Sequence, residues 1–388
     1  MFPLFFYQYF NFDQDNSVMH IKSMAVSSNE YYSFVLPGIA MWAIGLKTSF
    51  FKHNPDIDTI KFNSFKPQLV RRNIIPFTLV LLSLISFFIK PLVANEFSYI
   101  FYLLSNLYII AALYLFYSKP KYKYLYLFIA FAIMLVASIQ SALFGDFIFL
   151  LFTSLLVISL AFSLSLPAKL SLIIMGLVFM FLIQSIKMDY RKQIWLKGSN
   201  PAYFIDLLAN KIKNPASLFQ KETLFPIAAR FNEGWLIAKT MAYVPSVNHY
   251  ANGETILKSF AAVIVPRFLW KNKPVSGGKA NLVRFTGIKD LNYSMNIGPI
   301  GEAWANFGKI GGILFLFLYG LLFRGLFDII LKIIHAGYPT VILWLPLLFF
   351  RAIVVETDIL TTLNSLVKTG ILVFILYWLY SRVFKLQL

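Results

Sequence analysis

One short segment of the chain gathers cationic side chains around a tryptophan. The apolar spacing over residues 255–268 predicts a short helix that a proline ends. The residues presented at and after that end are Arg267, Trp270, Lys271 and Lys273. Guanidinium and ammonium groups bind phosphate oxygens through charge-assisted hydrogen bonds, so this cluster suits a diphosphate with an adjoining sugar. The alternative is that the tryptophan and the lysines only anchor the segment at a membrane interface.

A carboxylate and an amide lie together at the start of a later apolar helix. Glu302 and Asn306 are four residues apart, so a helix places both on one face. A carboxylate at the edge of a membrane is costly unless it is used or paired, which favours a functional role. The alternative is a structural partner for a loop arginine. Arg351, Glu356 and Asp358 either extend the same site or form a structural ion pair.

Two further groups are weaker candidates. Arg230 and Glu233 are three residues apart in a predicted helix over 228–241, where they share a face. An ordinary surface ion pair explains that spacing equally well. His249 precedes Tyr250 and could act as a base, although a histidine in such a place is more often a structural hydrogen-bonding group.

Metal and cofactor chemistry is not expected. The chain has no cysteine, and its four histidines are scattered without metal-ligand spacing. Residues 56–58 read Asp-Ile-Asp, but they lie in a lysine-rich turn, and residues 298–301 lack the βαβ context that a dinucleotide fingerprint requires. We therefore expect neither a metal nor a cofactor.

The candidate residues are embedded in a strongly apolar chain. Hydrophobic residues make up 59% of the 388 residues and charged residues 13%, which excludes a water-soluble fold. The apolar residues fall into blocks of about 20, the length of a helix that crosses a bilayer. The sequence therefore predicts an all-α polytopic membrane protein. The nine candidate spans are residues 31–51, 73–94, 97–117, 124–143, 147–166, 169–187, 307–327, 339–358 and 365–383.

The connections between these spans fall into two sets, one rich in basic residues and one without them. The turns at 52–72 and 118–123 are rich in Lys or Arg, whereas the turns at 95–96 and 361–364 contain neither. By the positive-inside rule, the basic turns are cytoplasmic, and the N-terminus and the long loop 188–300 are external.

The expected domains are six N-terminal spans in 1–187, the loop lobe 188–300 and three spans in 301–388. The loop holds 15 Lys or Arg and six Asp or Glu, a net charge of +9. Anionic lipid head groups, pyrophosphates or acidic glycans are the expected partners, and nucleic acid is not.

Three stretches of the chain resemble a known family, the bacterial O-antigen polymerases or oligosaccharide repeat-unit polymerases. In order, they are RFNEG at 230–234, PRFLWKNKP at 266–274 and GPIGEAWANFG at 298–308. Together they cover under a fifth of the chain, and the second and third are the more specific.

The resemblance implies a GT-C-like glycosyltransferase of the bacterial cytoplasmic (inner) membrane, with its large loop on the periplasmic side. It would transfer the growing glycan from undecaprenyl pyrophosphate to a sugar hydroxyl of the next lipid-linked repeat unit. A chain-length regulator and a flippase are candidate partners. The alternatives are an O-antigen ligase, which delivers the finished glycan to a lipid A core, and a lipid-linked oligosaccharide flippase or transporter.

Each candidate residue has a role in that chemistry. Arg230 and Arg267, assisted by Lys273, would stabilise the pyrophosphate leaving group. Glu302 is the first choice of base for the acceptor hydroxyl, and His249 is the second. The remaining residues assigned to substrate binding are Lys271, Trp270, Glu233, Asn306 and Tyr250.

Overall fold

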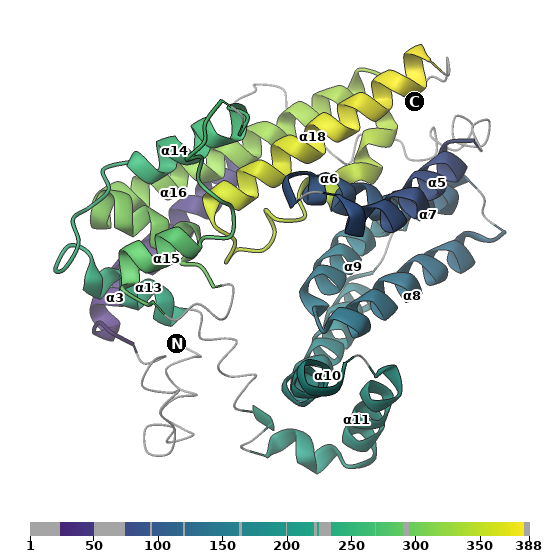
Figure 1. Cartoon of the computed structure of the whole chain (residues 1–388), viewed down its shortest axis with the longest axis horizontal. Coiled ribbons are helices and arrows are strands. Elements are labelled where there is room, and N and C mark those ends of the chain that lie inside the picture. Colours follow the sequence, from purple (N-terminus) through teal and green to yellow (C-terminus); the bar gives the residue numbers. More distant parts are fainter. Residues whose placement is uncertain are drawn as a thin grey trace. The chain divides into compact units, whose positions relative to one another are not determined.

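The chain is built from helices in every part that the structure describes (Figure 1). The computed structural model describes residues 24–49, 74–93, 95–118, 121–162, 165–198, 200–220, 223–224, 234–267, 269–289 and 295–383. All regular elements in these ranges are α- or 3₁₀-helices. The all-α prediction is therefore confirmed for the described residues.

Within those ranges, six helical segments are long and apolar enough to cross a membrane. They are Ile74–Leu92 (α5 with η4), Phe97–Ser118 (α6 and α7), Lys123–Ser141 (α8), Leu166–Lys197 (α10), Gly298–His335 (α16) and Ile359–Arg382 (α18). Each covers most of one predicted span, and the protein is a multi-pass helical membrane protein.

The full set of nine predicted spans is not confirmed. Helix α3 (Ser28–Lys47) covers most of the first predicted span but is not among the six. Helix α9 (Phe144–Ser159) is apolar but has only 16 residues, about 24 Å of helix, which is short for a bilayer core of about 30 Å.

The predicted span 339–358 is wrong as a single helix. The 3₁₀-helix η6 (Pro339–Trp344) and α17 (Leu345–Leu348) are followed by turns up to residue 358. The second half of the segment holds Arg351, Glu356 and Asp358, so hydropathy averaged over the whole stretch concealed a polar half. A new helix then begins at Ile359, after Asp358 caps it.

The chain packs as two compact units. The first unit comprises residues 1–55, 228–332 and 351–367, and the second comprises residues 56–227, 333–350 and 368–388. The domain boundaries expected from the sequence separate membrane spans from an external loop, whereas these units are defined by packing. The units therefore do not test those boundaries, which stay a prediction.

In the first unit, α3, α13 (Gly234–Tyr243), α15 (Lys279–Thr286) and the start of α16 share one core. Phe34 of α3 meets Trp304 of α16 edge to face, with ring centroids 4.9 Å apart. The Trp304 indole also donates a 2.9 Å hydrogen bond to the carbonyl of Val244. This core fixes the start of α16, which carries Glu302.

Two glycines allow α3 and α16 to lie unusually close. Gly45 faces the α16 backbone at Phe317 and Gly320, and Gly320 faces the α3 backbone at Trp42. A side chain at either position would overlap a carbonyl oxygen of the other helix. Small residues at such crossings are the usual basis of close packing between membrane helices.

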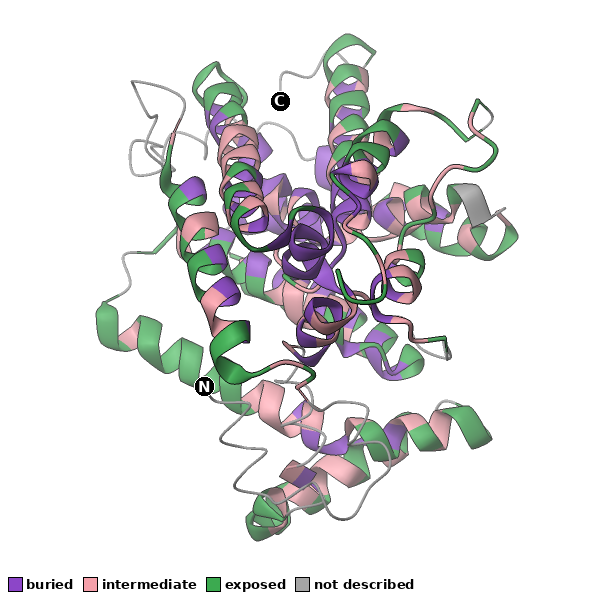
Figure 2. Cartoon of the chain, turned by 90° about the vertical axis from the view of Figure 1, so that its left-hand side faces the viewer, coloured by how far each residue is buried: buried purple, intermediate pink, exposed green. Residues whose placement is uncertain are grey.

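The second unit holds α5 to α11, with α7 (Leu107–Ser118) packed against α5 and α8. The aromatic rings of Tyr190 and Phe204 join α10 to α11 (Pro201–Lys213), with centroids 5.1 Å apart. The Tyr190 hydroxyl donates to the carbonyl of Ile139 at 2.9 Å. Most helices of the chain carry both buried residues (purple) and exposed residues (green) in Figure 2.

Candidate functional site

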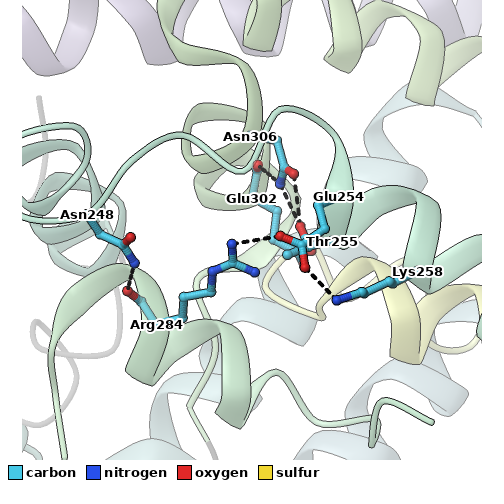
Figure 3. Close-up of polar contacts among 7 residues, drawn as sticks. All are labelled: Asn248, Glu254, Thr255, Lys258, Arg284, Glu302 and Asn306. Atoms are coloured by element: carbon cyan, nitrogen blue, oxygen red, sulfur yellow. Dashed lines mark hydrogen bonds and ion pairs between the residues drawn. The ribbon is translucent and has the colours of Figure 1, made fainter. Parts of the chain in front are cut away.

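Glu302 and Asn306 lie on one face of α16, as their spacing predicts, and both side chains are fully buried (Figure 3). The Asn306 amide donates to the backbone carbonyl of Glu302 at 2.8 Å and to the Thr255 hydroxyl at 2.7 Å. Thr255 lies in the first turn of α14 (Glu254–Ile264). Asn306 therefore ties the start of α14 to the start of α16.

The Glu302 carboxylate joins three segments that are distant in sequence. One oxygen accepts the backbone N–H of Ile359, the first residue of α18, at 3.0 Å. The other accepts the side-chain amide of Asn281 on α15 at 3.1 Å. Both donors are neutral, and no arginine, lysine or histidine of the described residues forms an ion pair with Glu302. In the described part of the chain, Glu302 is thus not the partner of a loop arginine.

Asp358 supplies a second buried carboxylate beside Glu302. Its Oδ1 accepts the backbone N–H of Thr361 at 2.9 Å, which caps the start of α18. Its Oδ2 is buried and accepts no hydrogen bond from the described residues. Glu302 accepts the N–H of Ile359, the residue directly after Asp358, so the two acids are neighbours. A buried acid pair with an unsatisfied oxygen is costly, and such costs are concentrated at functional sites.

A glycine turn covers this acid pair. The N–H of Gly277 donates to the Thr361 hydroxyl at 2.7 Å. Gly278 has φ +70°, and a Cβ built on it would lie 3.3 Å from the Cβ of Asp358 and would overlap Asn296. Only glycine combines that backbone conformation with so close an approach.

A cluster of charged residues lies at the start of α14, beside Glu302 and Asn306 (Figure 3). Glu254 forms ion pairs with Lys258 and, at 2.8 Å, with Arg284 of α15. Hydrogen bonds from Arg284, which has the larger effect, and from Lys258 lower the pKa of Glu254 to about 2. Asn248 donates to the backbone carbonyl of Arg284 at 2.8 Å, which ties the α13–α14 connection to α15.

The predicted cationic residues lie at the other end of α14. The helix ends at Ile264, two residues ahead of the proline; the predicted range up to residue 268 is therefore too long, although a proline does follow the helix end. The Lys273 ammonium donates to the carbonyl of Val265 at 2.8 Å. This bond holds Lys273 beside the segment that carries Arg267, and partial burial, with a smaller effect from the charge of Arg267, lowers the pKa of Lys273. Arg267 and Lys271 are exposed.

No contact between described residues joins these cations to the acids. Eleven residues of α14 rise about 15 Å from Glu254 to Ile264, so the helix leads the chain away from Thr255 and Asn306. Among the described residues, neither Arg267 nor Lys273 forms a hydrogen bond or an ion pair with Glu302 or Asp358.

The remaining candidates are distributed as follows. Tyr250 packs on Gly308, where α16 is kinked, and partial burial raises the pKa of its hydroxyl. His249 is exposed, and no hydrogen bond links it to Glu302 within the described ranges. Trp270 is partly buried, and Arg230 and Glu233 lie outside the described residues.

Sequence reasoning missed three residues of this site, Asn281, Arg284 and Glu254, and it missed the capping role of Asp358. The four-residue spacing of Glu254 and Lys258 could have indicated an ion pair on a helix. No local pattern could have indicated the contact between Asn281 and Glu302, because packing alone brings these residues together.

Comparison with known proteins places the chain in a family. No curated protein and no solved structure matches it. Residues 5–378 match the family model described as a domain of unknown function, DUF8712. Because that match covers nearly the whole chain, the chain belongs to the DUF8712 family.

Proposed function

We propose that this protein is a membrane glycosyltransferase that polymerises lipid-linked oligosaccharide repeat units. The growing glycan would leave undecaprenyl pyrophosphate and join a sugar hydroxyl at the outer face of the bacterial inner membrane. The observation that carries the proposal is the buried pair of Glu302 and Asp358, with neutral hydrogen-bond donors and cationic side chains on the neighbouring helices. A transferase of this kind needs a base and cations, and it needs no metal.

In the proposed reaction, the bond between the anomeric carbon and the pyrophosphate oxygen breaks, and a bond to the acceptor oxygen forms. Glu302 takes the hydroxyl proton, with the unsatisfied Oδ2 of Asp358 as a second acceptor beside it. Since both acids are buried, the hydroxyl reaches them only when the glycine turn at 277–278 moves aside.

Cations would offset the charge that develops on the pyrophosphate. Arg267, Lys271 and Lys273 remain the proposed seat for the lipid diphosphate, with Arg230 assisting. The geometry adds Arg284, which is one helical turn from Asn281, the amide that binds Glu302. Because no contact between described residues joins residues 265–274 to the acids, this segment would approach the acids during transfer, or Arg284 would take over the leaving group.

The glycan phenotype of a deletion strain tests this proposal. Loss of a polymerase leaves lipid A capped with a single repeat unit. Loss of a ligase leaves full-length polymer that is not attached to lipid A, and loss of a flippase leaves lipid-linked units on the cytoplasmic side. Either of the last two results would contradict the polymerase proposal.

Variants of the site test the assigned residues in the same strain. Glu302→Gln and Arg267→Ala, expressed and inserted normally, should restore little or no polymer. Lys197→Ala is the matched control, because Lys197 is an exposed cation at the end of α10, away from the acid pair in sequence and packing. Polymer of normal length from Glu302→Gln would show that this carboxylate is not the base.

A further inference from the structure

Helix α14 has one buried face and, beside it, one exposed apolar stripe. The buried face carries Ile256, Ser259 and Ala262, which pack within the first unit. The exposed stripe consists of Leu257, Phe260 and Ile264, which are 70%, 39% and 80% exposed. These three residues recur at the three- and four-residue spacing of a single helical stripe. The described part of the chain thus leaves this stripe uncovered.

The exposed stripe continues into the loop after the helix. Leu269 and Val275 are each 70% exposed. Three cationic residues lie near them in the sequence. They are Arg267, Lys271 and Lys273, which we call the cationic tip. The nearest acid on the helix, Glu254, is already paired with Lys258 and Arg284, so it does not offset the tip.

This surface combines the properties of a helix that lies in a membrane interface. At 11 residues α14 is too short to span a bilayer, yet it exposes large apolar side chains next to cations that form no ion pair with any described residue. Its first turn is bonded to Asn306 near the start of α16, a helix apolar enough to span. That bond holds α14 near the end of a membrane helix, where head groups lie.

We propose that α14 and residues 265–275 dock on the head-group layer of a membrane that contains anionic lipid. Leu257, Phe260, Ile264 and Leu269 would enter the boundary with the acyl chains, and the cationic tip would contact lipid phosphates. This docking does not depend on glycosyl transfer, so either proposal can be refuted without refuting the other.

The chain offers a direct test because it contains no cysteine. The full-length protein is placed in nanodiscs, with a fluorophore on a single cysteine at Ile264→Cys or Leu269→Cys. The matched control is Lys258→Cys, which lies on the charged flank of the same helix. Each label is exposed to a lipid carrying a shallow spin-label quencher and, separately, to a water-soluble quencher.

We expect the lipid quencher to reach the labels at 264 and 269, and the aqueous quencher to reach the label at 258. Discs of phosphatidylglycerol should give stronger lipid quenching at 264 than discs of phosphatidylcholine. Replacing Arg267, Lys271 and Lys273 by glutamine should abolish that preference, because each charge removed weakens the docking equilibrium on anionic lipid by about fivefold.

Three results would overturn the proposal. Aqueous quenching of all three labels would place the stripe in water. Protection of positions 264 and 269 from both quenchers would show that another protein segment or a second copy covers the stripe. A lipid contact that ignores lipid charge and the triple substitution would refute the role of the cationic tip.

Discussion

The crossing of α3 and α16 gives the sharpest test of the packing. A Cβ on Gly45 would overlap the carbonyl oxygen of Phe317 and would lie 3.0 Å from the amide nitrogen of Leu321. A Cβ on Gly320 would likewise overlap the carbonyl oxygen of Trp42. The obstructing atoms are backbone, so no side chain can rotate away. One added methyl group must therefore push the two helices apart.

The expected cost follows from this geometry. Overpacking a closely packed contact costs about 1–3 kcal/mol. Alanine in a helix is otherwise favoured over glycine by about 1 kcal/mol. Gly176 and Gly370 supply the control, since no described atom lies within 4 Å of a Cβ at either position. This gain is common to all four helical positions, so we expect Gly45→Ala or Gly320→Ala to be about 1–3 kcal/mol less stable than Gly176→Ala or Gly370→Ala.

The measurement is unfolding of the purified protein in detergent, followed by heat or by denaturant. The double variant Gly45→Ala/Gly320→Ala should lose less than the two single losses combined, because the first methyl already separates the helices. If Gly45→Ala melts together with Gly176→Ala, α3 and α16 do not cross at these glycines. Fully additive losses in the double variant would show that the two sites are independent, which also contradicts the crossing.

Three further outcomes are expected from the region around the acid pair. Gly278→Ala should destabilise the protein by about 1–3 kcal/mol in the same unfolding assay. Gly337→Ala is its control, since Gly337 also has positive φ but has open space around it, so equal losses would refute the close approach at residue 278. Thr255→Val should cost about 1–3 kcal/mol by removing a buried partner of Asn306, and faster hydrogen exchange in α14 should accompany it. Glu254→Gln should cost under about 1 kcal/mol at pH 7, because the pair is partly exposed. The pKa of Glu254 is lowered to about 2, so its contribution is present above the ordinary pKa near 4.5 and is lost as pH falls toward 2. The unfolding difference between wild type and Glu254→Gln should therefore shrink between pH 4.5 and 2, and a constant difference would contradict the ion pair.

Local patterns predicted the local parts of this molecule well. The end of α14 before Pro266 and the shared face of Glu302 and Asn306 follow from helix geometry and proline chemistry alone. The partly helical nature of loop 188–300 is likewise visible in α13, α14 and α15.

Predictions failed or stayed open in two situations. In one, a hydropathy average hid polar residues; in the other, the structure depends on contacts between residues that are distant in the sequence. Hydropathy averaged over 339–358 hid the polar residues that end α17 and begin α18. The partners of Glu302 come from residues 21 and 57 positions away, so no spacing rule indicates them. The sequence likewise does not specify the path of α14 and of the loop after it, and along that path no contact between described residues joins the cationic tip to the acids.

The bond from the N–H of Ile359 to Glu302 has a consequence for where phosphate can bind. The first N–H groups of a helix and its dipole together attract negative charge, and helix starts are common phosphate sites. At the start of α18, Asp358 and Glu302 already take N–H groups of the first turn. Two carboxylates of the protein itself thus occupy the anion-binding position at this helix end. That compensation helps two acids to coexist there, and it obliges any incoming phosphate to be bound by cationic side chains elsewhere.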